Sequence, residues 1–307
     1  MLDWRKSNAP IPGATFPGEK AEAWRGRGRE LLASTDGGES FDDSSVEPGV
    51  WRYATASRVR VIVDAQDYFD LMQQAMLKAR QRVLLIGWDF DSRIHLTRGR
   101  RWWQKPMRRR EYPSRLGSFI LWLTRDCRRV EVRILNWSAG TLKYAMRGAM
   151  ALDLIRWLPH KRIDFKFDNA HPLGCSHHQK IGVIDDSLAV CGGIDMADRR
   201  GDTREHREHE PRRQRPGGQP YGPWHDMTMM LEGPVAGALD WLGRDRWSRA
   251  GGRPLADLRP SQESAWPDGL DPHFQNVEVG IARTRAAYRD AAAVNEIIIC
   301  PDRYGEH

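Results

Sequence analysis

The sequence predicts an α/β fold in which helices cover both faces of a mixed, mostly parallel sheet. Short runs rich in β-branched residues recur between residues 59 and 231, and amphipathic stretches of helical length separate several of them. Such alternation is typical of an α/β/α sandwich. The chain has 307 residues and is 40% hydrophobic, which is enough for a sizeable buried core.

The elements follow one another in an order that supports this fold class. The first predicted helix places Phe69, Met72 and Met76 on one face. We expect strands at 59–64, 83–88, 130–136, 163–167, 178–184, 188–191 and 227–231, and helices at 65–80, 114–128, 141–158 and 234–249.

Composition divides the chain into three parts. Residues 1–50 are rich in Gly, Pro, Ser and acids and predict a loosely ordered leader. Residues 51–253 form the predicted lobe, in which the polar segment 199–223 is expected to be a long surface loop. Residues 254–307 are predicted to form a linker and the start of a second lobe. Because little chain follows, we expect a truncated gene product.

Charge and composition limit the partners and the location. The net charge of +7 and the pI near 9.4 favour anionic partners, either phospholipid surfaces or nucleic acid. The 4 cysteines form no CxxC pair, and no apolar run approaches the roughly 18 residues of a membrane span. We therefore expect a cytoplasmic protein, peripheral at the inner membrane face.

A basic segment occupies residues 98–110. It combines 7 basic residues with Trp102 and Trp103. Tryptophan beside arginine is typical of an interfacial patch on anionic lipid, although the same charges would bind a nucleic-acid backbone or form a solvated loop.

One motif carries the chemistry. His178, Lys180 and Asp185 have the spacing HxKxxxxD on a predicted strand, where His178 and Lys180 would project from the same face. An imidazole can form a covalent phospho-intermediate, and an ammonium stabilises the negative charge that grows in the transition state. Asp185 would orient or balance these groups. The alternative interpretation is that His178 is an ordinary core residue whose hydrogen bonds are made by its neighbours.

Further residues are candidates for the edge of the same pocket. Gly192 and Gly193 would let the backbone approach a phosphate, and Asp195 adds an acceptor for lysine or imidazole. His225, next to Asp226, is expected to line the pocket rather than to catalyse.

A metal is not expected from the sequence. Asp89 and Asp91 share one strand face, but no matching histidine or carboxylate cluster accompanies them. The additional histidines near the motif or in the long loop are expected to be mostly exposed: His171, His177, His206 and His209.

The HxKxxxxD motif followed by Gly-Gly-Ile-Asp resembles the phospholipase D superfamily, which includes cardiolipin synthases, phosphatidylserine synthases and some nucleases. The segments 87–91 and 223–226 are similar to the first lobe of its lipid-directed, two-motif members, and the resemblance covers Val46 to Arg285. It implies an α/β/α sandwich and a phosphohistidine mechanism without a cofactor. By resemblance, His178 is the nucleophile or its acid partner, Lys180 the phosphate clamp and Asp185 a supporting carboxylate.

The resemblance also implies a second HxKxxxxD motif, and this sequence contains only one. We therefore expect a hydrolase or transphosphatidylase acting on phospholipid diester bonds, with its second motif supplied by a partner or another lobe. The alternatives are a catalytically inactive phosphate- or lipid-binding fragment and a homodimeric single-motif nuclease. Phospholipid at an anionic membrane is the expected substrate, a homodimer is a possible assembly, and nucleic acid is the less favoured partner.

Overall fold

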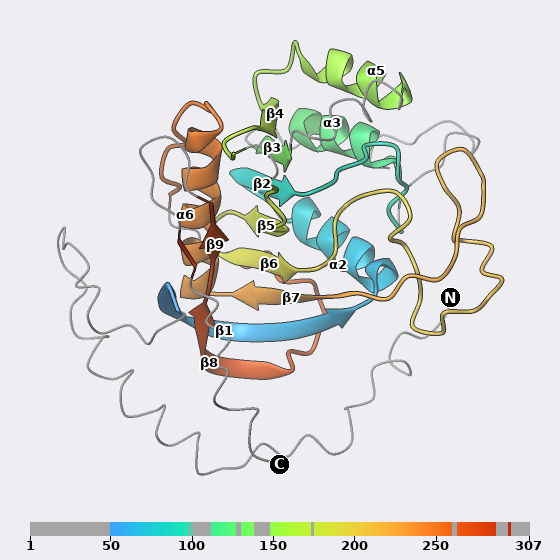
Figure 1. Cartoon of the computed structure of the whole chain (residues 1–307). Helices are drawn as coiled ribbons and strands as arrows, with labels where there is room; N and C mark the ends of the chain where they lie inside the picture. Colours follow the sequence, from blue (N-terminus) through green and yellow to red (C-terminus); the bar gives the residue numbers. More distant parts are fainter. Residues whose placement is uncertain are drawn as a thin grey trace. The chain divides into compact units, whose positions relative to one another are not determined.

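A computed structural model describes residues 50–97, 99, 112–126, 130–137, 148–172, 175–259, 263–286 and 294–295. Within these residues, an eight-stranded sheet runs in the order β4-β3-β2-β5-β6-β7-β1-β8 (Figure 1). A second sheet pairs β9 with β10. The expected leader and the basic patch at 98–110, apart from residue 99, lie outside the described residues.

Seven of these ten strands overlap the expected ones, but β1 begins seven residues before its expected start, and β8, β9 and β10 were not predicted. The bounds are β1 (Arg52–Val63), β2 (Arg82–Gly87), β3 (Glu131–Trp137), β4 (Ile163–Asp168), β5 (Ile181–Ile184), β6 (Leu188–Gly192), β7 (Met227–Glu232), β8 (Phe274–Ile281), β9 (Thr284–Arg285) and β10 (Val294–Asn295). The helices are α2 (Ala65–Leu77), α3 (Leu116–Asp126), α5 (Gly148–Trp157) and α6 (Pro234–Arg249).

The predicted α/β class is confirmed, but the expectation of a mostly parallel sheet is wrong. Only the β2–β3 and β3–β4 pairs of the large sheet are parallel, and its other pairs are antiparallel. Helices α3 and α5 lie between the parallel strands, as a parallel crossover requires. In contrast, three residues join β5 to β6, which is too short for a crossover and makes an antiparallel hairpin.

Helices pack on both faces of the sheet. On the central strand β2, Val83 and Leu85 belong to the apolar core shared with α2, α3 and α5, whereas Leu84 and Ile86 belong to the core under α6. Alternate side chains of a strand point to opposite faces, so a continuous apolar run such as β2 is the signature of a strand covered on both sides. Figure 1 shows α6 crossing one face of the sheet, with α2 and α3 on the other.

The strand β8 lies beyond residue 253, where the sequence placed the end of the lobe. It pairs antiparallel with β1, so that Tyr53 lies opposite Gly280 and Val59 opposite Phe274. Residues 274–281 thus form an edge of the large sheet rather than part of a separate one.

The polar segment 199–223 is a loop, as expected, but it is not wholly on the surface. Asp202 and Arg213 are both buried, and Arg213 Nη1 donates to Asp202 Oδ1 at 2.9 Å. Arg213 also donates to the carbonyl oxygens of Arg207, Glu208 and Tyr221. A buried charged pair with such complete hydrogen bonding organises the loop from inside.

Candidate active site

His178 and Lys180 lie in an extended segment immediately before β5, rather than within the strand. The imidazole of His178 is exposed, while Lys180 is only 8% exposed. The Lys180 ammonium donates to the His178 carbonyl oxygen at 2.9 Å. Both side chains approach the Trp88 ring, His178 edge-on at 5.6 Å between ring centroids and Lys180 Nζ at 5.9 Å from the centroid. The two groups therefore share one side of the segment.

Asp195 ties Lys180 to the end of β2. Its Oδ1 accepts the backbone N–H groups of Trp88 at 3.0 Å and Asp89 at 3.3 Å. Its Oδ2 is buried, accepts no hydrogen bond within the described residues, and lies 3.5 Å from Lys180 Nζ. The carboxylate thus positions both the Trp88 backbone and the lysine charge.

Burial and neighbouring charge shift the titration of this cluster. The pKa of His178 is lowered by partial burial and by the positive charges of Lys180 and Arg200. Burial also lowers the pKa of Lys180, while the Asp195 carboxylate opposes that shift. A lowered pKa leaves more of the His178 imidazole neutral near pH 7, which is the form that can act as a nucleophile.

Asp185 lies at the opposite end of β5 from Lys180. Its carboxylate accepts three backbone N–H groups, from Arg80 at 2.6 Å and from Gln81 and Arg82 at 2.8 Å each. These contacts secure the segment that leads into β2. The structure therefore does not bring Asp185 together with His178 and Lys180, and places it in a turn where its own φ is +52°.

The paired glycines pack against the start of β7. A side chain on Gly193 would collide with the Asp226 carboxylate, and one on Gly192 would collide with Thr228. The Gly193 N–H donates to the Met227 carbonyl oxygen at 2.8 Å. These positions need glycine because β6 and β7 approach closely, a reason that the sequence alone did not supply.

His225 precedes β7 and is held by a residue that the sequence did not single out. Its Nδ1 lies 2.8 Å from Asp64 Oδ1, and its side chain is 65% exposed. Asp64 sits between β1 and α2. Neighbouring Asp226 contributes an electrostatic interaction to His178 and Lys180, so this segment borders the cluster.

The carboxylates of Asp89 and Asp91 have different partners. Asp91 Oδ2 accepts from Arg93 at 2.7 Å, whereas Asp89 Oδ1 accepts the N–H of Phe90 at 2.9 Å. Through these contacts, the two aspartates that share a strand face in the sequence pattern stabilise the turn after β2.

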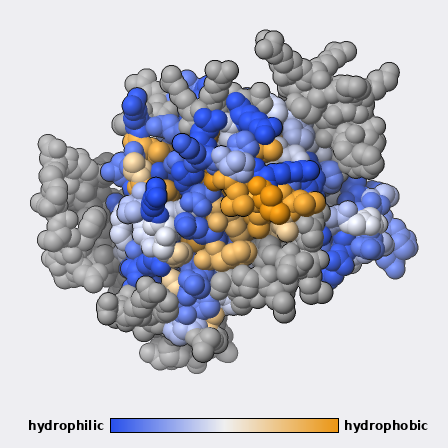
Figure 2. Space-filling model, turned by 90° about the horizontal axis from the view of Figure 1, so that it is seen from above, coloured by the Kyte–Doolittle hydropathy of each residue, from blue (hydrophilic) through white to orange (hydrophobic). Residues whose placement is uncertain are grey.

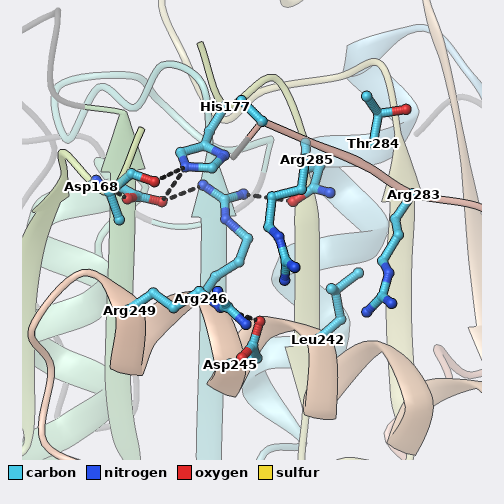
Figure 3. A pocket seen from close by; sticks show the side chains of 12 residues that line it. Asp168, His177, Leu242, Asp245, Arg246, Arg249, Arg283, Thr284 and Arg285 are labelled. Carbon is cyan, nitrogen blue, oxygen red and sulfur yellow. Dashed lines mark hydrogen bonds and ion pairs between the residues drawn. The ribbon is translucent and has the colours of Figure 1, made fainter. Parts of the chain in front are cut away.

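A pocket rich in arginine adjoins the motif (Figure 3). Arg246 of α6 reaches Asp168 at 2.7 Å and Gln179 at 3.0 Å, and His177 lies 3.7 Å from the same Asp168 carboxylate. Arg283 and Arg285 line the other side of this pocket. Sequence reasoning missed it because its walls come from β4, α6 and the segment after β8.

The outer face of α5 is apolar. On α5, Leu152 and Ile155 are 56% and 61% exposed, and Leu158, in the turn directly after the helix, is 81% exposed. The spacing of three places Leu152 and Ile155 along one side. Helix α5 lies at the top of Figure 1, and Figure 2, seen from above, shows apolar side chains gathered at the centre of this face. Clustered exposed apolar side chains mark contact surfaces more often than scattered ones do.

No helix in the described part of the chain is both long enough and apolar enough to cross a membrane.

Comparison with known proteins finds several phospholipases D among the proteins to which the chain is similar. It is 23% identical over 234 residues to phospholipase D B of Dictyostelium discoideum, covering 65% of this chain and 18% of that protein. It is 33% identical over 119 residues to phospholipase D alpha 1 of Spuriopimpinella brachycarpa, covering 30% and 15%. Human phospholipase D1 is 28% identical over 149 residues, covering 47% and 13%. The chain thus spans less than a fifth of the length of these relatives.

Among solved structures, a phospholipase D family member named Nuc from Salmonella typhimurium matches with a TM-score of 0.39 and 12% identity, over 62% of this chain and 95% of that chain. Phosphatidylserine synthase of Haemophilus influenzae matches with a TM-score of 0.40 and 12% identity, over 79% and 48%. No family model matches the chain.

The α/β sheet thus presents one HxKxxxxD segment in which Lys180 lies beside the buried Asp195 carboxylate. These distant homologues support membership of the phospholipase D superfamily.

Proposed function

We propose that this chain carries one half of a phosphodiester-cleaving site of phospholipase D type, with His178 as nucleophile and Lys180 as phosphate clamp. The observation that carries the proposal is the joint placement of the two groups: an exposed imidazole with a lowered pKa beside an ammonium held by Asp195. A nucleophile must reach its substrate, and a fixed cation beside it stabilises the charge that develops on phosphorus.

The proposed reaction has two steps. A ring nitrogen of His178 forms a bond to phosphorus while the bond to the leaving oxygen breaks, and the leaving alkoxide takes a proton from an acid. Water or an alcohol then attacks the phosphohistidine, loses its proton to a base and frees His178. Lys180 faces the phosphoryl oxygens in both steps. We assign Asp185 a structural role, because its carboxylate is occupied by three backbone N–H groups at the far end of β5.

The acid that protonates the leaving group is proposed to come from a second HxKxxxxD motif. This sequence contains one such motif. In an isologous pair, two copies would each contribute one His178 to a shared site about a two-fold axis. A separate lobe carrying its own motif would serve the same purpose.

The proposed substrate is a phospholipid. Three observations support it: the relatives above are named phospholipases D, the chain has a net charge of +7, and α5 with the turn after it presents Leu152, Ile155 and Leu158 to solvent. Cationic charge attracts anionic headgroups, and exposed apolar side chains can enter the boundary of the acyl chains.

The decisive experiment combines solution mass with hydrolysis of phosphatidylcholine vesicles, run in parallel with single-stranded DNA. We expect phosphatidylcholine hydrolysis from a dimer, or from a monomer only after a second lobe bearing its own motif is added. Cleavage of DNA without cleavage of phosphatidylcholine would overturn the lipid assignment. High turnover by a strict monomer would overturn the two-motif proposal and make His225 the next acid to test.

The variant His178→Asn tests the nucleophile in the same assay. It should abolish turnover and remove the phosphatidyl adduct that mass spectrometry of alkali-quenched protein detects on His178. The control is His209→Asn, an exposed histidine in the loop 199–223, which should retain turnover. Turnover of His178→Asn within a few-fold of the unchanged chain would exclude His178.

A further inference from the structure

Three side chains from distant parts of the sequence meet at the edge of the large sheet. They are Asp64 at the end of β1, His206 in the loop 199–223, and His225 before β7, and one ligand atom from each lies within 4.8 Å of the others. Asp64 Oδ1 is 2.8 Å from His225 Nδ1, and Asp64 Oδ2 is 3.2 Å from His206 Nε2.

The carboxylate at the centre of this cluster is buried and incompletely satisfied. Asp64 is 1% exposed, and its Oδ2 accepts no hydrogen bond within the described residues. A buried carboxylate oxygen without a partner costs free energy, so the site favours a cation beside it.

The orientation of His206 strengthens this conclusion. Its Nδ1 lies 3.1 Å from Asp202 Oδ2. Asp202 is buried and accepts hydrogen bonds from Arg213 Nη1 at 2.9 Å and from the Trp224 N–H at 2.9 Å. A carboxylate can only accept, so Nδ1 carries the proton and Nε2 faces Asp64 Oδ2. Two lone pairs would repel at 3.2 Å unless a cation lies between them.

We propose that Asp64, His206 and His225 bind one divalent transition-metal ion of the zinc class. Two imidazoles and one carboxylate are typical zinc ligands, whereas calcium and magnesium prefer ligands that are all oxygen. Asp202 occupies the place of the outer carboxylate that orients a metal-binding histidine. The 65% exposure of the His225 side chain leaves the fourth position open to water.

Such an ion would fasten the loop 199–223 to the ends of β1 and β7. Arg200 and Asp226 lie in or beside these segments, and both interact electrostatically with His178. The competing interpretation is that His206 is doubly protonated and pairs with Asp64 as an imidazolium. The two differ in whether the cluster takes up a metal.

The test is a titration of the full chain, stripped with a chelator, with Co²⁺ followed by visible absorption and with Zn²⁺ followed by calorimetry. We expect one ion per chain and a rise in unfolding temperature with Zn²⁺ but not with Ca²⁺. The variants His225→Ala and His206→Ala should each weaken binding at least about tenfold, while His209→Ala in the same loop should not.

Circular dichroism of each variant checks that it remains folded, which matters less for the more exposed His225 than for the half-buried His206. Absence of Co²⁺ and Zn²⁺ binding by the folded unchanged chain would overturn the proposal and favour the imidazolium. Equal affinity in the unchanged chain, His225→Ala and His206→Ala would overturn it as well, because the metal would then bind elsewhere. Neither result depends on phosphodiesterase activity.

Discussion

Lys180 Nζ lies 3.5 Å from Asp195 Oδ2, and both side chains are buried. The carboxylate holds the ammonium beside His178 and at the same time accepts the backbone N–H groups of Trp88 and Asp89. The charge proposed to clamp a phosphate is therefore fixed by a residue 15 positions further along the chain, at the far side of a hairpin.

Breaking this pair should destabilise the protein. Asp195→Asn retains an acceptor for the two backbone N–H groups but leaves a buried ammonium without its counter-charge, which we expect to cost about 3 kcal/mol in the free energy of unfolding. Urea denaturation measures the loss. The matched control is Asp245→Asn, which removes a more exposed ion pair with Arg249 and should cost ~0.5 kcal/mol or less. Equal losses in the two variants would show that the buried Lys180–Asp195 pair contributes no more to the free energy of unfolding than the exposed pair does.

Asp185 should prove structural rather than catalytic. Asp185→Asn suits the left-handed backbone at this turn. It replaces one of the two carboxylate oxygens that accept three backbone N–H groups, so we expect a loss of about 2 kcal/mol in unfolding free energy. Asp186→Asn, in the same turn and with a similar φ, is the control. Turnover per folded molecule should be unchanged by Asp185→Asn. A drop of more than tenfold with intact folding would restore its catalytic role.

The pH dependence of turnover should report His178. The nucleophile must be neutral, so kcat/KM should fall as the pH drops through its pKa, and burial, Lys180 and Arg200 place that pKa below the ordinary value of 6.5. Arg200→Gln removes one of these positive charges, so the acid limb should move to higher pH. Arg207→Gln, an exposed arginine paired with Glu205, serves as the control. An acid limb that Arg200→Gln leaves in place, or moves to lower pH, would contradict this assignment.

Vesicle binding should depend on the exposed face of α5. Ile155→Asp combined with Leu158→Asp places charge where the apolar side chains would enter the lipid boundary, and we expect binding to anionic vesicles to fall at least about tenfold. Phe274→Ser changes an exposed apolar residue on the edge strand β8 instead. Sedimentation with vesicles measures both. Similar losses in the two variants would remove α5 as the contact surface.

The sequence by itself determined the elements and the central motif. Seven strands and four helices were located because burial imposes periods of 2 and 3.6 on apolar residues, a local signal, although β1 begins seven residues before its expected start. The HxKxxxxD spacing likewise identified His178 and Lys180, because the two positions are only two residues apart in the chain. The superfamily assignment inferred from these residues is confirmed by the comparisons.

The tertiary structure decided everything that depends on distant pairing. Strand direction follows from the connection between neighbours, so the antiparallel majority became visible only when β5, β6, β7, β1 and β8 were seen side by side. Asp185 is close to the motif in sequence, but a four-residue strand carries it to the opposite end of the sheet. Conversely, Asp64, His206 and His225 are separated by up to 161 positions and meet only because β1 pairs with β7 and the intervening loop folds back onto both. Periodicity reports which face a residue occupies, whereas long-range hydrogen bonding and burial decide which residues it meets there.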